Sequence, residues 1–399
     1  MNLPANVKYI ISTLEAAGYE AFAVGGCVRD VIRAVTPKDW DIATSATPEQ
    51  AKALFKRTID TGIKHGTITV LLERQHYEVT TYRIDGEYLD NRRPETVEFT
   101  GDIIEDLSRR DFTMNAIAYN PAKGFVDPFG GRVDIENKLI RCVGDPIHRF
   151  GEDALRMLRA IRFSGVTGYA ICRHLLAAIG KLNKNIANVS PERIREELGK
   201  LIISPNPGAI QLLHTSGLLP FILQGRAYDG DIVQVIKWLQ TCPPHEAMRT
   251  ALFLHRTSDD CEKILRDLRY DNKSIKEISL YVQMLPTHIP HNRYEIKKVL
   301  RYVAQCNVAQ PPQDFLENLL TLKSITEAQN FDAILQEVRD IHATGECFTL
   351  KQLAVSGKDL AEIGIPHGKE MGDKLEAMLD AVMCNPSLNT RKTLINFIS

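Results

Sequence analysis

The 399-residue chain lacks the sequence features of several large protein classes. Its eight cysteines form no Cys-x-x-Cys pair, which argues against a zinc ribbon or a disulfide framework and indicates reduced thiols. No apolar run approaches the roughly 20 residues of a membrane span, and residues 1–20 carry no apolar signal-peptide core. A G-x-x-x-x-G-K-S/T loop and a His-Asp doublet are both missing, which removes P-loop ATPases and His-Asp phosphohydrolases. These absences favour a soluble, cytoplasmic protein.

The chain also has no excess of charge, since its net charge is −1. Global charge therefore gives no sign of nucleic-acid binding, and any basic surface has to be local. The length suggests two to four structural units.

The two parts of the chain have different periodicities. Up to about residue 143, short β-rich runs alternate with glycines and turns, and GTITVLLE and HYEVTTYRI, joined by a short RQ link, predict a hairpin. TPEQAKALFK predicts a helix with Thr47 as N-cap and Pro48 at its first position. From about Asp153 onward amphipathic helical patterns dominate. The pattern predicts an α/β head followed by an elongated helical body.

The segment VGGCVRD contains the first candidate site. Gly25 and Gly26 follow a predicted strand and precede a predicted helix, where paired glycines let backbone N–H groups approach a phosphate. Arg29 stands one turn further on and would reach the same anion. The alternative is a plain tight turn, and the motif by itself does not decide between them.

The segment DWDIAT contains a pair of acids. On a strand, Asp39 and Asp41 would point to the same face, about 7 Å apart. Two hard oxygen donors suit Mg²⁺, which favours one or two carboxylates together with substrate phosphates. Glu78, in a strand that could lie beside this one, is the predicted third carboxylate. The alternative readings are a solvated turn for the pair and an exposed strand face for Glu78.

The segment SRRDFTMNAIA places Arg110 and Asp111 before a run that looks buried. Arginine suits triphosphate oxygens, and Asp111 could accept a hydrogen bond from a ribose hydroxyl. The alternative is a salt-bridged helix start.

The segment GEDALRMLRAIRF is predicted to be one helix with a row of charged residues. The members of this row recur every third position: Asp153, Arg156, Arg159 and Arg162. A parallel apolar row, Leu155, Leu158 and Ile161, would pack the helix down. A nucleotide laid along the charged row would have its base edge near Asp153 and Arg156 and its phosphates near Arg159 and Arg162. The alternative is an ion-paired surface helix.

In this order, the motifs resemble those of the class II CCA-adding tRNA nucleotidyltransferases, members of the polymerase-β-like superfamily. The resemblance rests on GGCVRD, DWDIAT, KHGTITV, YEVTTYRIDGEYLDNRRPETVEF, RRDFTMNAIA, DPFGG, EDALRMLRAIRF, ERIREEL and, near the C-terminus, VSGKDLAEIGIPHGKEMG.

The resemblance implies an α+β fold with a polymerase-β-like nucleotidyltransferase head, a mixed sheet with helices, followed by an elongated all-α neck, body and tail. The expected bounds are 1–143 for the head, 144–203 for the neck, 204–325 for the body and 326–399 for the tail. The head would hold Mg²⁺, the neck would select the base of CTP or ATP, and the body and tail would hold the tRNA acceptor stem. Neither a membrane nor an obligate protein partner is expected.

The resemblance also implies roles for individual residues. Asp39 and Asp41 would bind the metal. The role of Glu78 as a third catalytic carboxylate, which helps to deprotonate the attacking hydroxyl, is a hypothesis from its strand position and not part of the resemblance. The residues expected to bind the nucleotide are Gly26, Arg29, Arg110, Asp111, Asp153, Arg156, Arg159 and Arg162. Basic residues of the tail are candidates for tRNA phosphates: Lys358, Lys369, Lys374, Arg391 and Lys392.

Several alternatives stay open. Within the family, the enzyme could add only CC, only A, or a poly(A) tail. The segment RIDGEYLDNRRPETVEF looks complete, which disfavours CC-only addition. Outside the family's chemistry, the chain could be an RNA-binding protein on an inactive scaffold, but that predicts a lost carboxylate or a broken arginine row.

Overall fold

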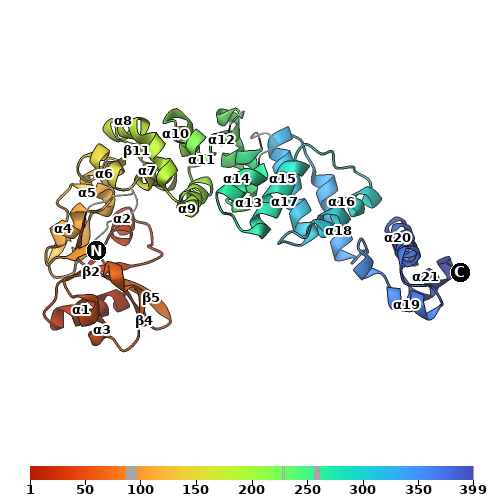
Figure 1. Ribbon diagram of the computed structural model, residues 1–399, viewed down its shortest axis with the longest axis horizontal. Helices are drawn as coiled ribbons and strands as arrows, with labels where there is room; N and C mark the ends of the chain where they lie inside the picture. The colour runs from red at the N-terminus through yellow and green to blue at the C-terminus, as the bar shows by residue number, and fades with distance from the viewer. Residues whose placement is uncertain (87–96, 227, 229, 256–260, 399) are drawn as a thin grey trace. The chain divides into compact units, whose positions relative to one another are not determined.

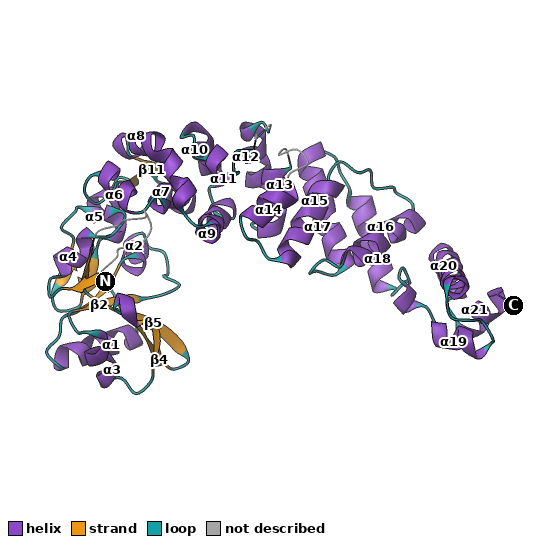
Figure 2. Cartoon of the chain, viewed as in Figure 1, coloured by secondary structure: helices purple, strands orange, loops and turns teal. Residues whose placement is uncertain are grey.

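The computed structural model describes residues 1–86, 97–226, 228, 230–255 and 261–398 (Figure 1). The chain divides into two compact units, Met1–Ala227 and Tyr228–Ser399. All the strands of the described residues lie in the first unit, and the second is helical (Figure 2). The mixed sheet followed by helices confirms the predicted fold class. The finer division into head, neck, body and tail stays a prediction.

A seven-stranded mixed sheet forms the core of the N-terminal part of the first unit. Its strand order is β3-β4-β5-β2-β1-β8-β9. The strands are β1 Ala21–Val24, β2 Asp41–Thr44, β3 Thr58–Gly62, β4 Thr67–Leu72, β5 Gln75–Thr81, β8 Ala118–Asn120 and β9 Gly124–Val126. Every neighbouring pair is antiparallel except β2 and β5, which run parallel. Two small two-stranded sheets pair β6 Arg83–Asp85 with β7 Val97–Phe99 and β10 Leu139–Ile140 with β11 Ala170–Ile171.

Helices complete the first unit. They are α1 Ala5–Ala16, α2 Gly26–Ile32, α3 Pro48–Leu54, α4 Ile103–Ser108, α5 Gly131–Glu136, α6 Pro146–Glu152, α7 Leu155–Thr167, α8 Arg173–Leu182, α9 Pro191–Ile202, α10 Gln211–Thr215 and α11 Leu219–Ile222.

The local sequence signals for the hairpin and for α3 are confirmed. Strands β4 and β5 pair antiparallel with Leu72 opposite Gln75, so the turn residues are Glu73 and Arg74, one position earlier than the predicted RQ link. Helix α3 begins after Thr47, whose side chain forms a reciprocal capping box with Gln50.

A close backbone contact fixes the buried segment that follows the RRD motif. Gly131, at the start of α5, lies so close to this segment that a Cβ atom there would stand 2.1 Å from the carbonyl oxygen of Thr113. Only glycine fits at this contact. The second glycine of the DPFGG motif therefore lets α5 pack directly against residues 111–117 and helps to hold them in place.

Gly131→Ala is therefore expected to lower the free energy of unfolding by about 1–3 kcal/mol, the usual range for overpacking. Gly180→Ala on α8 is the matched control, because a Cβ there meets nothing within 4 Å. Thermal denaturation of both variants checks the prediction. Equal midpoints for the two would contradict it.

The second unit consists of helices in the residues that the structure describes. They are α12 Ile232–Thr241, α13 Glu246–Leu254, α14 Cys261–Asp267, α15 Asn272–Met284, α16 Arg293–Cys306, α17 Pro312–Glu327, α18 Asp332–Ala343, α19 Gly357–Glu362, α20 Lys369–Cys384 and α21 Arg391–Ile398. Across the described ranges of both units, no helix combines the length and the apolar character that a membrane crossing requires.

A buried charge network ties three helices of the second unit together. Lys297 of α16 is 1% exposed, forms an ion pair with Glu346, which follows α18, and donates a 2.9 Å hydrogen bond to the carbonyl of Met383 on α20. Arg293 binds the same Glu346 carboxylate at 2.6 Å. The Glu346 carboxylate thus forms ion pairs with two basic side chains of α16.

Candidate active site

A cleft of about 690 Å³ in the first unit brings the sequence motifs together. Eight arginines and three aspartates line it, so its wall favours a polyanion. The lining residues are Gly25, Gly26, Arg29, Asp41, His65, Arg83, Arg109, Arg110, Asp111, Asn115, Asp153, Arg156, Arg159, Arg162, Phe163 and Arg193. Of the predicted site residues, Asp39 and Glu78 are outside this lining.

The glycine turn lines the cleft. Gly25 has φ +80°, and a Cβ there would lie 3.0 Å from Nη1 of Arg110, so glycine permits both the turn and the approach of the arginine. Arg29 is buried, donates from Nη1 to Oδ1 of Asn115 at 2.6 Å, and lies 5.2 Å from the ring centre of Phe163. Asn115 had not been singled out from the sequence.

The acidic pair differs from its prediction in one respect. Strand β2 begins at Asp41, so Asp39 precedes the strand, and the alternation of side chains along a strand does not fix its direction. The predicted neighbour is confirmed, because β5 lies parallel to β2 with Glu78 directly opposite Asp41. All three acids are solvent-exposed.

The electrostatics of these acids suit a cation. Although Asp41 is exposed, the protein around its carboxyl group and the charge of Glu78 raise its pKa to about 6, with a smaller contribution from Asp39, while Arg110 acts the other way. Within the described residues, no three His, Cys, Asp or Glu side chains form a ready-made metal cluster. The carboxylates of Asp39 and Asp41 are hard oxygen donors, which fit a hard cation that also binds substrate phosphates and water.

The RRD segment follows α4 rather than opening a helix. Arg109 and Arg110 both pair with the buried Asp106, at 2.8 and 3.1 Å. Burial raises the pKa of Asp106, but the two arginines lower it below its ordinary value. The pairing fixes both arginines at the cleft wall.

Asp111 is saturated by donors from the protein. Its Oδ2 accepts hydrogen bonds from Nε and Nη2 of Arg159, at 2.9 and 2.6 Å. Its Oδ1 accepts from the backbone N–H of Phe112 and from Nδ2 of Asn115, at 2.8 and 3.0 Å. Burial opposes ionisation, but Arg159 holds the pKa of Asp111 well below its usual range. The predicted contact with a ribose hydroxyl stays a prediction.

The single helix predicted from Gly151 to Phe163 is wrong. Helix α6 ends at Glu152 and α7 begins at Leu155, with Asp153 between them in an extended conformation (φ −138°, ψ 104°). The physical reason is local, since the Asp153 carboxylate accepts a hydrogen bond from the N–H of Leu155 at 3.1 Å and competes with helix continuation. Asp153 therefore stands before the row of arginines, not on it. The apolar row of α7 is buried as predicted.

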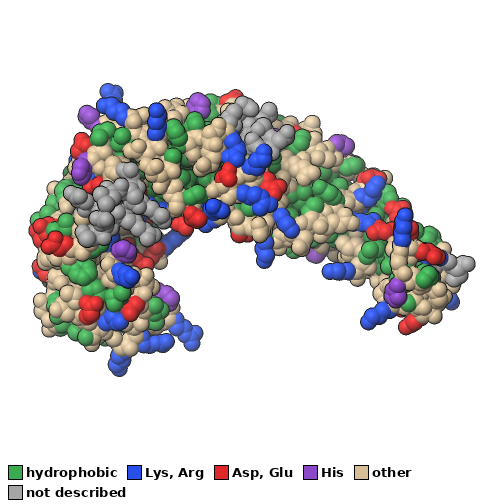
Figure 3. Space-filling model, viewed as in Figure 1, with side chains coloured by type: hydrophobic (Ala, Val, Ile, Leu, Met, Phe, Trp, Pro, Cys, Tyr) green, Lys and Arg blue, Asp and Glu red, His purple; other side chains and the backbone are tan. Residues whose placement is uncertain are grey.

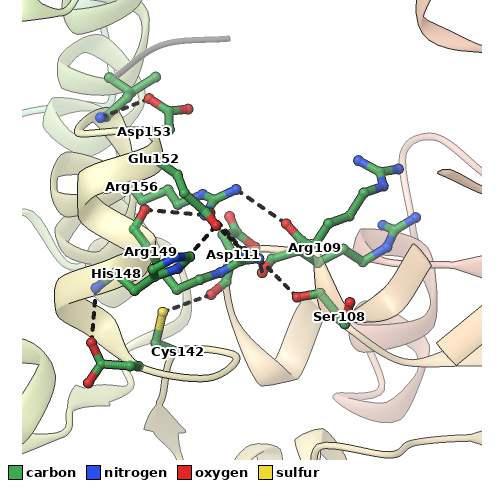
Figure 4. A network of polar contacts seen from close by, with 12 residues as sticks. Ser108, Arg109, Asp111, Cys142, His148, Arg149, Glu152, Asp153 and Arg156 are labelled. Carbon is green, nitrogen blue, oxygen red and sulfur yellow. Dashed lines mark hydrogen bonds and ion pairs between the residues drawn. The ribbon is translucent and has the colours of Figure 1, made fainter. Parts of the chain in front are cut away.

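Each arginine of α7 has an acidic partner. Arg156 pairs with Glu152, which lies between Arg149 and Arg156 in Figure 4. Arg162 donates to Glu197 of α9 at 2.7 Å and lies 3.6 Å from the ring centre of Phe163. Arg159 reaches Glu197 at 3.3 Å in addition to Asp111. The excess positive charge expected from the local sequence is thus partly balanced by acids from elsewhere in the chain.

Helix α9 adds two residues that the sequence analysis had not assigned. Arg193 lines the cleft and binds the Asp153 carboxylate, and Glu197 binds two arginines of α7. Both belong to the ERIREEL segment, where opposite charges four positions apart on one helix face were the available signal.

Two further expectations concern regions outside the cleft. Among the basic residues expected to contact tRNA, Arg391 pairs with Asp359 and Glu362, and Lys374 pairs with Glu370. Basic and acidic side chains accordingly lie side by side at the C-terminal end in Figure 3. In the segment RIDGEYLDNRRPETVEF, residues 87–96 lie outside the described part of the chain.

The comparisons with known proteins agree with this geometry. The chain matches the family described as the poly A polymerase head domain over residues 21–141, the probable RNA- and SrmB-binding site of polymerase A over 168–228, and the putative tRNA nucleotidyltransferase domain 2 over 243–398. A curated CCA-adding enzyme of Geobacillus sp. (strain WCH70) is 34% identical, covering 94% of this chain and 91% of the relative. One from Lactiplantibacillus plantarum is 35% identical, covering 99% and 96%.

Solved structures extend the similarity to the fold. The crystal structure of the Bacillus stearothermophilus CCA-adding enzyme in complex with CTP has a TM-score of 0.85 at 31% identity, covering 100% of this chain and 98% of that one. The Thermotoga maritima CCA-adding enzyme complexed with tRNA, at 19% identity and a TM-score of 0.64, shares the fold.

Proposed function

The chain belongs to the CCA-adding enzyme family and is a nucleotidyltransferase, and we propose that it adds C, C and A in succession to the 3′ end of tRNA from CTP and ATP in the cleft of its first unit. The observation that carries the proposal is the arrangement of this cleft, in which Asp41, paired in register with Glu78, faces a wall of arginines. Carboxylates can bind a metal ion and accept the proton of a hydroxyl group, and arginines can bind the oxygens of a triphosphate.

The reaction requires a divalent metal, as its family implies, and we assign Mg²⁺ to Asp39 and Asp41. A bound divalent cation would supply positive charge to the attacking and leaving oxygens. Its charge would also offset the burial and the repulsion from Glu78 that together raise the pKa of Asp41.

The other steps of the reaction are assigned to side chains of the protein. The 3′-hydroxyl oxygen of tRNA bonds to the α-phosphorus, the bond to the β-phosphate oxygen breaks, and pyrophosphate leaves. Glu78 accepts the hydroxyl proton, which is the role we assign to it from its position opposite Asp41. Gly26, Arg29 and Arg110 bind the triphosphate.

Base selection is assigned to Asp153 and Arg156. A carboxylate accepts a hydrogen bond from the exocyclic amine of cytosine or adenine, while a guanidinium donates to a ring acceptor. Uracil and guanine present a carbonyl in place of that amine, and a polar group left unpaired in a buried site costs about 1–3 kcal/mol. Asp111, Arg159 and Arg162 complete the nucleotide site.

We assign the larger segments to consecutive tasks. Residues 1–143 would carry out catalysis, 144–203 base selection, and 204–325 and 326–399 would bind tRNA. Phosphate contacts make tRNA affinity fall with rising salt. A cytoplasmic location is supported by the eight cysteines, all of which are free thiols within the described residues.

The test uses tRNAs that end before the first C, after the first C and after the second C, each incubated with each nucleotide. We expect addition of C, C and A in order, followed by a stop. Products limited to CC or A, or a long A tract, would assign one of the related activities instead. No product with any RNA would support an inactive RNA-binding protein. Omitting Mg²⁺ is expected to stop incorporation, and restoring it to recover the full rate.

A further inference from the structure

We propose that Arg193 of α9 is a positioning residue that fixes the Asp153 carboxylate, so that discrimination between nucleobases depends on an arginine 40 residues away in the chain. The inference rests on the proposed function, because it concerns how the base-selecting residue of that site is held.

Asp153 needs positioning because its backbone does not supply it. The residue stands in the extended break between α6 and α7, where its backbone N–H still bonds to the carbonyl of Arg149 but its φ and ψ are not helical, so neither helix fixes the direction of its side chain. Within its own segment, the carboxylate is tied by one hydrogen bond, from the N–H of Leu155 to Oδ1. One bond to one oxygen leaves the carboxylate plane free to turn.

Arg193 removes that freedom. Its Nη2 donates to Oδ2 of Asp153 at 2.8 Å, and its Nη1 lies 3.4 Å from Oδ1, so the guanidinium holds both oxygens. Both side chains line the cleft, with 14% of Asp153 and 30% of Arg193 exposed. The pair therefore lies where an incoming base would meet it.

Helix α9 is itself held firmly against α7. A Cβ on Gly165 of α7 would lie 2.8 Å from Cδ1 of Leu201 and 2.7 Å from Oγ of Ser204, so the two segments pack closely. This packing fixes the helix from which Arg193 projects.

The same face of α9 also holds the other end of the charged row. Glu197 stands four positions after Arg193 and binds Arg159 and Arg162 of α7. Opposite charges on α9 thus match opposite charges at the start and along the length of α7, with Arg193 facing Asp153 and Glu197 facing Arg159 and Arg162.

Loss of Arg193 should affect the choice of nucleobase more than the nucleotidyl-transfer step. Without Arg193, Asp153 keeps its charge and its bond to Leu155, but its second oxygen loses its direction toward the base. The groups assigned to metal binding and proton acceptance, at the start of β2 and on β5, are among the described residues and make no hydrogen bond or ion pair with Arg193, so they are expected to be unaffected. We therefore expect Arg193 variants to lose base discrimination while keeping the catalytic step.

The experiment measures kcat/KM for CTP against UTP with tRNA lacking CCA, and for ATP against GTP with tRNA ending in CC. Arg193→Met is expected to reduce both ratios by about tenfold, mainly through a higher KM for CTP and ATP. Arg193→Lys keeps the charge but not the two-pronged contact, and should recover part of the selectivity. Arg266→Met is the matched control, since Arg266 of α14 pairs with an exposed Glu262 outside the cleft.

A double-mutant cycle with Asp153→Asn separates positioning from direct contact. If Arg193 acts through Asp153, the double variant should discriminate no worse than Asp153→Asn alone. Additive losses would assign Arg193 a direct contact with the nucleotide and overturn the inference. Unchanged ratios in Arg193→Met would overturn it as well, while leaving the proposed function intact if the wild-type chain completes CCA. If Arg193→Met fails to fold, Arg193→Gln replaces it, and wild-type selectivity with wild-type KM in that variant would overturn the inference.

Discussion

An Asp41→Asn variant is expected to incorporate neither C nor A, with kcat/KM reduced by about a thousandfold, while tRNA binding is retained. Asn preserves the size of the side chain but removes the negative charge that would hold the metal. Asp41 is the first residue of β2 and pairs in register with Glu78, so its backbone position is fixed by the sheet and should survive the change. Asp39→Ala is expected to give the same loss.

Single-turnover incorporation and tRNA binding by filter retention check this prediction. Asp60→Asn is the control, because Asp60 lies on β3 in an exposed ion pair with Lys52. Normal turnover by Asp41→Asn would show that the metal assignment is wrong. Loss of tRNA binding together with activity would point to a folding defect instead.

A Glu346→Gln variant is expected to destabilise the second unit by about 3 kcal/mol, because breaking a buried ion pair leaves a cation without its counter-charge. Lys297 is 1% exposed and cannot reach water readily, and Arg293 loses the same partner. Glu262→Gln is the control, since its ion pair with Arg266 is exposed and surface pairs contribute little.

The measurement can be confined to the second unit. The chain has two tryptophans, Trp40 in the first unit and Trp238 in the second. In a Trp40→Phe background, Trp238 fluorescence during urea unfolding reports the second unit alone. Equal midpoints for Glu346→Gln and its parent would contradict the prediction.

The effect should also depend on pH in a defined direction. Burial raises the pKa of Glu346, but hydrogen bonds from Arg293 and Lys297 lower it to about 2, below its ordinary value of 4.5. Because the folded-state pKa is the lower one, the stabilisation is complete above the ordinary value and is lost as the pH falls toward 2. The difference between wild type and Glu346→Gln should therefore shrink in acid.

The sequence predicted those features that depend on neighbouring residues or on the alternation of side chains along a strand. The Thr47 cap, the β4–β5 hairpin and the placement of Glu78 beside the DxD strand all follow from such rules. The break at Asp153 did not, because helical periodicity continues through it and a single side-chain hydrogen bond to Leu155 decides otherwise.

Partners far apart in the sequence were equally out of reach. The pairs Asp111–Arg159 and Asp153–Arg193 join residues 48 and 40 positions apart, and no pattern within one helix indicates them. Periodicity tells which face of a helix is polar, but it does not tell which helix will face it. The sequence therefore indicated most of the charged residues that line the cleft, but it missed Arg193 and did not indicate how the charges pair.

The parallel pairing of β2 with β5 in the seven-stranded sheet has a consequence for how this chain can change in length over evolution. Asp41 and Glu78 meet because β2 and β5 are aligned, and the chain between them passes through α3, β3 and β4. Insertions in the connections around α3 would leave that alignment in place, because loop closure is only weakly sensitive to length. One residue added within β5 before Glu78 would turn its side chain to the opposite face of the sheet. Length variation among descendants of this chain should accordingly accumulate around α3 and be absent from the strand that carries Glu78.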